Sequence, residues 1–394
     1  MAPLPPLSLY VHLPWCVRKC PYCDFNSWSG AAEAPRERYL QSLIADLDTA
    51  KGLAAGRSLI SIFLGGGTPS VFTPAEIGRL LEEVGKRFSL VDDVEITMEA
   101  NPGTVECGAP GGYREAGVNR LSIGAQSFDA TKLAALGRIH TVDDIGRTVN
   151  EARDAGFDNI NIDIMYALPG QGVAAAMHDI EMAAALQPTH ISWYHLTLEP
   201  NTVFYARPPA DLPDDELSYS IQQSGESLLA ALGYERYEVS AFARDGRYCQ
   251  HNLNYWSFGD YLAVGAGGHG KISTEHGISR YMRPTNPQQF MNAIEAGEGD
   301  VLPAVLSDED LLFEFMLNAL RLMAGFDERL FTSRTGLPVD ILRRRLEPLV
   351  ERELICERGG HKWIPTTTGQ RFLNDLQAHF LPEKQGRTTL FEAG

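Results

Sequence analysis

Residues 15–25 read WCVRKCPYCDF and place Cys16, Cys20 and Cys23 in the spacing Cys-x3-Cys-x2-Cys. These are three of the six cysteines in a chain of 394 residues. Thiolates are soft ligands that suit iron–sulfur clusters and zinc. A fully coordinated [4Fe–4S] cluster takes four cysteines, so three cysteines leave one iron open to another ligand. Zinc is the alternative, because His12 could complete a Cys3His site, but the spacing favours the cluster.

Strand-like and helix-like segments alternate along the first half of the chain. Strands are expected at residues 8–13, 58–64, 94–100, 120–126, 159–167 and 190–198. Helices are expected between them, at residues 35–50, 74–88, 141–155 and 172–186. Strands that alternate with helices in this way form right-handed βαβ units and a parallel sheet. The predicted fold class is therefore α/β, a partial TIM-like (β/α)6 barrel rather than a closed eight-stranded one.

The pattern changes after Pro208-Pro209, and the rest of the chain is expected to form smaller units. Helices are predicted at residues 339–353 and 366–377, on either side of a hairpin near residues 354–364. This order resembles a winged-helix arrangement and predicts a C-terminal α+β domain. We divide the chain into a barrel at 1–240, a connecting segment at 241–306 and a winged-helix-like domain at 307–394.

Composition narrows the class of protein. The net charge of −17 argues against a nucleic acid as the main partner, because such binders usually carry a basic patch. No apolar run reaches membrane-spanning length, and the N-terminus lacks the pattern of a signal peptide. Six cysteines in a chain of this length do not suggest a secreted disulfide framework. We expect a cytoplasmic protein without a transmembrane segment; a peripheral membrane contact and a homodimer stay open.

The cysteine loop and a second motif together resemble the radical S-adenosylmethionine (SAM) family. In that family the Cys-x3-Cys-x2-Cys loop follows the first barrel strand, as it does here. Residues 64–69, LGGGTP, match the family's glycine-rich motif after the second strand. The resemblance implies that the three cysteines hold a [4Fe–4S] cluster and that the amino and carboxylate groups of SAM occupy its open iron.

The resemblance narrows to the coproporphyrinogen III oxidase-like group and covers nearly the whole chain. It rests on the blocks LYVHLPW at 9–15, EANPGT at 99–104, LSIGAQS at 121–127, LGRIH at 136–140, NIDIMYALPGQ at 161–171 and HLTLE at 195–199. It implies a SAM site made of Tyr10, Tyr22, Gly66, Gly67, Thr68, Glu99, Gln126, Arg138 and Asp163. The carboxylates can hold ribose hydroxyls or the amino group, and Arg138 can pair with the carboxylate of SAM. Each residue is otherwise a polar group of the barrel interior that its neighbours satisfy.

Two functions of different classes fit this group. One is an oxygen-independent coproporphyrinogen III oxidase, which uses a 5′-deoxyadenosyl radical to decarboxylate propionates. The other is a haem chaperone of the HemW type, which binds haem as cargo and hands it to apoproteins. The oxidases carry a further cysteine where this chain has Phe25, and a longer arm before the cluster than the 15 residues here. Both departures favour the chaperone and predict that oxidase activity is absent.

A third feature also favours the chaperone. Residues 251–256 read HNLNYW, which fits the His-Asn-x-x-Tyr-Trp motif of the haem chaperones. The imidazole of His251 is the predicted haem ligand, because imidazole is a common axial ligand of haem iron. Cys249 and His269 are weaker candidates, and a His251 that only caps a turn is the alternative. Of the remaining cysteines, Cys107 and Cys356 are expected to be buried apolar side chains.

Overall fold

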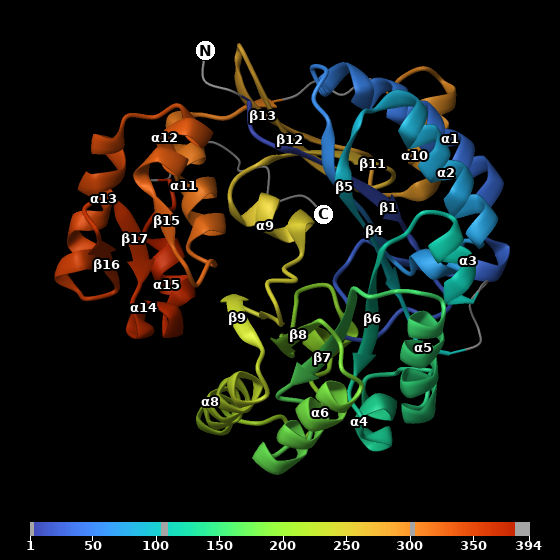
Figure 1. The fold of residues 1–394 in the computed structure, drawn as a ribbon, viewed down its shortest axis with the longest axis horizontal. Coiled ribbons are helices and arrows are strands. Elements are labelled where there is room, and N and C mark those ends of the chain that lie inside the picture. Colours follow the sequence, from blue (N-terminus) through green and yellow to red (C-terminus); the bar gives the residue numbers. More distant parts are fainter. Residues whose placement is uncertain (1–3, 104–108, 300–303, 383–394) are drawn as a thin grey trace.

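The computed structural model describes residues 4–103, 109–299 and 304–382, and Figure 1 shows their arrangement. Six parallel strands form the predicted partial barrel, pairing in the order β1-β4-β5-β6-β7-β8. They are β1 (Leu7–Leu13), β4 (Leu59–Gly66), β5 (Leu90–Ala100), β6 (Arg120–Gln126), β7 (Ile160–Tyr166) and β8 (His190–His195). The predicted α/β fold class is confirmed.

Helices connect the strands and cover the outside of the barrel (Figure 1). They are α1 (Arg36–Leu53), α2 (Pro74–Arg87), α3 (Pro110–Glu115), α4 (Ala130–Ala135), α5 (Val142–Asp154), α6 (Val173–Ala185), α7 (Val203–Ala206) and α8 (Asp215–Ala231). Short pieces complete this part: strands β2 (Trp15–Cys16) and β3 (Trp28–Ser29) and the 3-10 turns η1 (Ala31–Glu33) and η2 (Pro69–Val71). Local sequence explains the helix starts. In α2, Thr73 and Glu76 form a reciprocal capping box ahead of Pro74.

The barrel strands are apolar outside and polar inside. In β1, Leu7, Leu9, Val11 and Leu13 are fully buried in the main hydrophobic core, whereas Tyr10 lies between them on the other face. Side chains alternate between the two faces of a strand, so this pattern sends every second residue into the barrel. The interior is therefore lined by groups that can bind, orient or exchange protons.

The chain after residue 234 extends the sheet at both edges. Strands β9 (Glu235–Glu238) and β10 (Ala241–Ala243) join β8, while β11 (Asp260–Val264) pairs with β1 in parallel. Strands β12 (His269–Thr274), β13 (Gly277–Met282) and β14 (Ala304–Val305) follow in antiparallel order. Within the described residues this makes one sheet of twelve strands. Helix α10 (Pro287–Glu295) packs on α1, where Arg38 forms an ion pair with Glu295.

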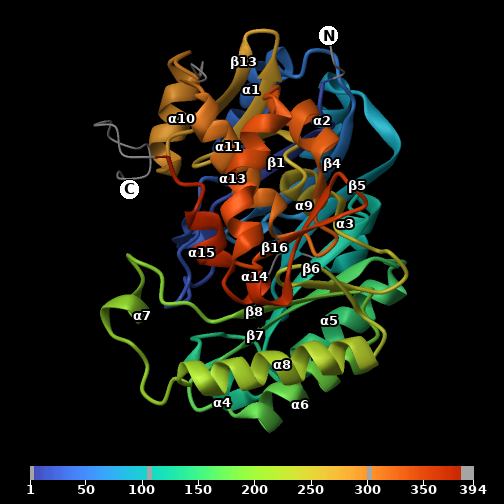
Figure 2. The ribbon, with the colours of Figure 1, turned by 90° about the vertical axis from the view of Figure 1, so that its left-hand side faces the viewer.

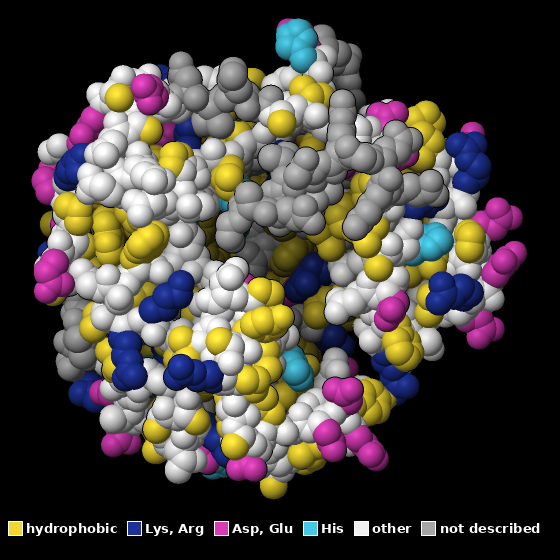
Figure 3. Space-filling view, turned by 180° about the vertical axis from the view of Figure 1, so that it is seen from behind, with side chains coloured by type: hydrophobic (Ala, Val, Ile, Leu, Met, Phe, Trp, Pro, Cys, Tyr) yellow, Lys and Arg dark blue, Asp and Glu magenta, His cyan; other side chains and the backbone are white. Residues whose placement is uncertain are grey.

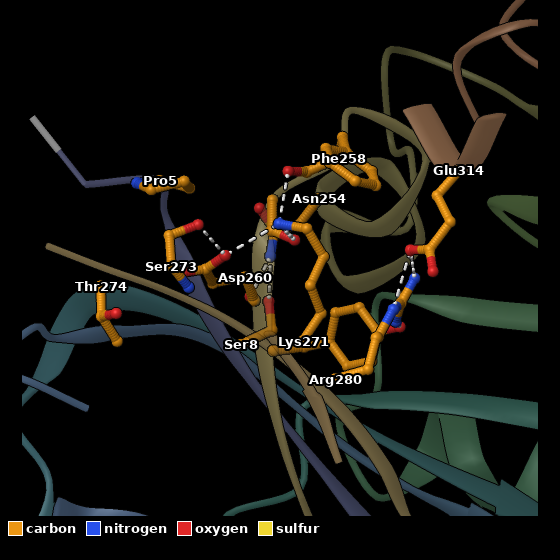
Figure 4. A network of polar contacts seen from close by, with 12 residues as sticks. Pro5, Ser8, Asn254, Phe258, Asp260, Lys271, Ser273, Thr274, Arg280 and Glu314 are labelled. Atoms are coloured by element: carbon orange, nitrogen blue, oxygen red, sulfur yellow. Dashed lines mark hydrogen bonds and ion pairs between the residues drawn. The ribbon is translucent and has the colours of Figure 1, made fainter. Parts of the chain in front are cut away.

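A buried polar network holds β11 and β12 against the start of the barrel (Figure 4). Asp260 accepts hydrogen bonds from Arg57 at 2.6 Å and Lys271 at 2.9 Å, and from the backbone and side chain of Ser273. Lys271 also donates to the carbonyl of Phe258 and lies over its ring, 4.2 Å from the centroid. Because both charges are buried, each depends on the other to offset its lost hydration.

The C-terminal domain has a core of its own and lies to the left of the barrel in Figure 1. Phe315 is at its centre and packs edge-on against Phe258, Phe326 and Phe331. Its elements are α11 (Asp308–Ala319), β15 (Phe326–Asp327), α12 (Glu328–Thr335), α13 (Val339–Glu351), β16 (Ile355–Arg358), β17 (Lys362–Pro365), α14 (Thr367–Arg371) and α15 (Leu373–Ala378). The hairpin between two helical segments matches the predicted winged-helix-like order.

Candidate functional site

The cysteine loop leaves the carboxyl end of β1 and returns to α1. The amide of Cys23 donates to the carbonyl of Cys20, and Lys19 donates to the carbonyls of Phe25 and Ser27, so the loop is folded tightly on itself. Cys16, Cys20 and Cys23 are each half-buried and reduced. In barrels of this kind chemistry occurs at the carboxyl ends of the strands, and the loop lies at that end.

His12 is not free to complete a zinc site. Its Nδ1 lies 3.0 Å from the hydroxyl of Tyr10, and its Nε2 lies 2.8 Å from the carbonyl oxygen of Asn26. Burial lowers its pKa, so the ring is neutral. Among the described residues, no group of three or more His, Cys, Asp or Glu side chains could hold a single metal ion. The cysteines of an iron–sulfur cluster bind different irons, so this arrangement suits a cluster better than zinc.

A chain of hydrogen bonds joins the first two cysteines through one residue each from the segments after β4, β5 and α4. Thr68 donates from its hydroxyl to Cys16 Sγ at 3.4 Å, and Asn101 donates to that hydroxyl at 3.0 Å. The Asn101 oxygen accepts from Arg138, whose other terminal nitrogen donates to Cys20 Sγ at 3.6 Å. Such outer contacts orient ligands and stabilise thiolates. Sequence reasoning missed Asn101, although it lies inside the EANPGT block.

The environment of Cys16 also fits a metal cluster. Burial raises the pKa of its thiol to about 11, although the Thr68 hydroxyl acts in the opposite direction. A thiolate at this position therefore needs a bound cation nearby, and iron would supply one.

The glycine-rich turn after β4 packs directly against the cysteine loop. Gly66 has φ of 115°, and a Cβ built there would lie 2.5 Å from the His12 ring. A Cβ on Gly67 would lie 2.7 Å from the Pro14 carbonyl group. The amides of Gly67 and Thr68 donate to the carbonyls of Leu13 and Trp15. Glycine is needed here so that two backbones can approach closely, which is a reason independent of any ligand.

Two carboxylates that influence each other lie on β5 and β7, with only β6 between these strands. Glu99, at the end of β5, accepts a hydrogen bond from the Gly66 amide at 3.1 Å. Asp163, on β7, accepts from Ser122 at 2.8 Å and from Asn161 at 2.9 Å. Burial and the charge of Asp163 raise the pKa of Glu99 to about 7, and burial also raises that of Asp163. A pair of desolvated carboxylates of this kind favours a cationic, hydroxyl-bearing ligand.

The remaining predicted SAM residues lie around the same opening. Gln126 has φ of 70°, an uncommon conformation for this residue type, and its side-chain oxygen accepts from Tyr194 at 2.7 Å. Tyr22 packs against Phe204 of α7, and burial raises its pKa. Tyr10 is deeper in the barrel, with its hydroxyl against His12. The structure therefore brings the predicted cysteines and SAM residues together at one end of the barrel.

Several large apolar side chains are exposed around this opening. Helix α7 packs on the cysteine loop through the Phe204 amide and the Pro21 carbonyl, and it projects at the left of Figure 2. Figure 3 views that side face-on and shows a central hollow edged by hydrophobic and basic side chains. The exposed apolar residues of the loop, of α7 and of the segment after α4 are Val17, Phe25, Trp28, Ile139, Val203 and Tyr205.

His251 lies away from this opening. It is on α9 (Gln250–Trp256), which packs against the first halves of β1 and β4. Its ring is buried against Phe63 and Tyr10, and its Nδ1 lies 3.1 Å from the hydroxyl of Ser61. Burial, with the charge of Arg120, lowers its pKa to about 3, so the imidazole is neutral. A neutral imidazole can bind a metal, but this one is enclosed by protein.

The other residues of the HNLNYW motif have structural contacts. Asn254 donates to the Ser8 hydroxyl and to the Asp260 carbonyl. Trp256 stacks under the guanidinium of Arg321 in the C-terminal domain, 4.2 Å from the ring centroid. The two rival haem ligands differ in exposure: Cys249 is fully buried and donates to Glu95, whereas His269 is exposed on β12. The motif therefore joins the barrel to the C-terminal domain, and the haem-ligand role of His251 stays a prediction.

Comparison with known proteins identifies the family. The Radical SAM superfamily model matches residues 10–199, and the HemN C-terminal domain model matches residues 306–382. A protein of Escherichia coli strain K12 named "Heme chaperone HemW" is 45% identical over 97% of this chain and 100% of its own length. A protein of the same name from Haemophilus influenzae is 44% identical over 98% and 100%.

A solved structure agrees with this assignment at the level of the fold. The Escherichia coli coproporphyrinogen III oxidase HemN, described as a radical SAM enzyme, superposes with a TM-score of 0.80 at 24% identity, over 96% of this chain and 90% of that one. At that identity the likeness concerns the fold alone. In the described part of the chain, no helix combines the length and the apolar character needed to cross a membrane.

Full-length similarity, the two domain matches and the grouping of the site residues lead to one conclusion: the chain belongs to the HemW family of the radical SAM superfamily.

Proposed function

We propose that this protein binds haem and transfers it to apoproteins, and that it carries a [4Fe–4S] cluster and SAM. The observation that carries the proposal is the similarity, over nearly the full length of both chains, to proteins named heme chaperone. The alternative, a coproporphyrinogen III oxidase, is supported by a likeness of fold to HemN and by the match of residues 306–382 to the HemN C-terminal domain model, and not by full-length sequence similarity of this degree.

The residues at the barrel opening fit the cluster and SAM. Cys16, Cys20 and Cys23 would hold three irons, and the cluster would offer its fourth iron to the amino and carboxylate groups of SAM. Thr68 and Arg138 donate hydrogen bonds to two of the sulfurs, which would help to orient them as ligands.

The carboxylates Glu99 and Asp163 complete the proposed SAM site. As anions they accept hydrogen bonds from hydroxyl and amino groups, and their charge attracts the sulfonium. Ser122 and Asn161 keep Asp163 in one orientation, as the Gly66 amide does for Glu99. Both residues are partly shielded from solvent, which strengthens their interaction with a bound cation.

We propose His251 as an axial ligand of haem. Its neutral imidazole has the electron pair that iron requires, and its pKa of about 3 keeps it neutral at any physiological pH. Because α9 buries the ring, haem would reach it only when α9 moves or when haem enters the barrel.

One experiment separates the chaperone from the oxidase. Anaerobically reconstituted protein is incubated with coproporphyrinogen III, SAM and a reductant, and protoporphyrinogen IX is measured. The chaperone predicts no product, together with a Soret shift on haem addition and transfer of that haem to an apoprotein. A useful rate of protoporphyrinogen formation would refute the proposal in favour of the oxidase.

A second measurement concerns the ligand. His251→Ala should change the haem spectrum more than Cys249→Ala, with unchanged cluster content in both variants. If haem binds equally well without His251, the protein still binds haem but through another group.

A further inference from the structure

A groove of about 540 Å3 lies on the outer face of the C-terminal hairpin. Five of its lining residues come from that hairpin: Cys356 and Arg358 on β16, and Lys362, Ile364 and Pro365 on β17. Cys356 lies opposite Ile364 and Arg358 lies opposite Lys362, so these four residues project from the same face. Met323, on the loop before β15, and the start of α14 border the groove. Its volume is in the range of small-molecule sites, roughly 300–1,000 Å3.

The groove concentrates positive charge on an acidic protein. Arg358 and Lys362 are exposed cross-strand partners, and neither forms an ion pair with any described residue. Like charges directly opposite each other on a sheet repel. Glu357 pairs with Trp363 on the other face of the hairpin, where its charge acts on Arg343, so it does not compensate them. On a chain with a net charge of −17, this local pair is suited to an anionic ligand.

The groove also contains two sulfur atoms that the barrel site does not use. Cys356 carries a free, half-buried thiol that donates to the Ile364 carbonyl at 3.5 Å. The Met323 side chain is half-buried at the border. Thiolate and thioether sulfur are both known axial ligands of haem iron. The sequence predicted a buried apolar role for Cys356, whereas the structure leaves its thiol at the wall of an open groove.

We propose that this groove is a second haem site, at which haem is presented to the acceptor protein. The inference rests on the proposed function. Haem contains a flat apolar ring, an iron atom and two carboxylates. The groove offers a matching group for each part: apolar surface at Ile364 and Pro365, sulfur at Cys356, and two cations. Binding is a ligand exchange: the thiol of Cys356 releases its proton to water, and the thiolate then donates an electron pair to ferric iron as a water molecule bound to that iron leaves. No electron is transferred in this step.

The position of the groove suits a hand-over. An acceptor protein can reach haem only where haem is exposed, and the side chain of His251 is enclosed between α9 and the barrel strands. The hairpin, in contrast, lies at the surface of the C-terminal domain, which faces the viewer in Figure 2. A buried site can retain cargo, and a surface site can release it.

The test is a haem titration of the reconstituted full-length protein, followed by absorption spectroscopy of the ferric and the ferrous–carbonyl forms. Wild-type protein should show a component with the spectrum of thiolate-ligated haem, and Cys356→Ser should lose it. Arg358→Gln with Lys362→Gln should weaken that component roughly tenfold, because two exposed ion pairs are lost. The matched control, Arg329→Gln with Arg344→Gln, removes two exposed cations of the same domain outside the groove and should leave the component unchanged.

The outcomes separate this inference from the proposed function. If wild-type protein binds no haem, the proposed function fails and the second site fails with it. If wild-type protein binds and transfers haem while Cys356→Ser and the groove double variant behave as the wild type does, only the second site is refuted. Loss of the thiolate spectrum together with slower transfer to an apoprotein supports the groove. Unchanged cluster content in the variants shows that they are folded.

Discussion

Replacing Glu99 by glutamine should stabilise the apoprotein at alkaline pH while weakening its site. Burial and the nearby Asp163 raise the pKa of Glu99 from 4.5 to about 7. An acid with a raised pKa binds its proton more tightly in the folded than in the unfolded state. Its full contribution to stability is present below pH 4.5 and is lost as the pH rises through 7.

The magnitude follows from that shift. Each pKa unit corresponds to about 1.4 kcal/mol, so a shift of 2.5 units, from 4.5 to 7, costs about 3 kcal/mol at pH 8. At pH 5 the raised pKa lowers the free energy of unfolding by only about 1 kcal/mol, because Glu99 keeps its proton in the folded state. Glutamine has no such titration. The free energy of unfolding of Glu99→Gln, relative to the wild type, should therefore rise by about 2 kcal/mol between pH 5 and pH 8.

The assay is urea unfolding of both apoproteins at the two pH values. Comparing the same substitution at two pH values cancels any effect of glutamine that does not depend on pH, such as altered packing. Asp93→Asn, at an exposed position of the same strand, is the matched control and should show no comparable change. In cluster-loaded protein, Glu99→Gln should also weaken SAM binding by roughly tenfold or more, since a charged hydrogen bond is lost. Equal pH dependence in wild type and Glu99→Gln would refute the buried, desolvated carboxylate described here.

Three further predictions concern the cysteine loop and its supports. Changing its three cysteines to alanine should reduce iron from about four per chain to background after anaerobic reconstitution, and a variant that keeps a full cluster would exclude these ligands. Asn101→Ala removes the link between Thr68 and Arg138, so it should lower the free energy of unfolding in urea by about 2–4 kcal/mol. It should also lower the fraction of protein that keeps its cluster. Unchanged iron content after buffer exchange would show that Asn101 does not support the cluster. Gly66→Ala should destabilise the apoprotein by about 2–4 kcal/mol, because the new Cβ would meet His12 and the φ of residue 66 is positive. The control is Gly85→Ala on α2, where an added Cβ has no atom within 4 Å and should not destabilise the protein. Equal urea midpoints for the two variants would contradict the close packing at Gly66.

The barrel was predictable because its signals are local. Strand β6 occupies residues 120–126 as expected, and α5 begins at Val142 after a capping box formed by Thr141 and Asp144. Alternating burial, caps and glycine turns depend on neighbours a few residues away, so a sequence displays them directly. The cysteine spacing is equally local, and so is the glycine-rich turn.

The sheet edges were not predictable in this way. Residues 259–270 are rich in glycine, which does not indicate a strand, yet they contain β11 and the start of β12. What makes β11 a strand is its pairing with β1, some 250 residues earlier in the chain. The buried Asp260–Lys271 pair then holds it in place. Hydrogen bonds between distant segments leave no period in the sequence, so only folding reveals them.

The candidate site also combines features that are set by neighbouring residues with features that are set by contacts between distant segments. The sequence by itself determined which residue types belong to the cysteine loop and to the strand ends, because their motifs are contiguous. Only the tertiary structure decided that Asn101 links Thr68 to Arg138, that the His251 side chain is enclosed between α9 and the barrel, and that Cys356 shares a groove with Arg358 and Lys362. These relations depend on which side chains are desolvated and which face one another across separate strands, and burial of that kind is a property of the packed chain rather than of any stretch of it.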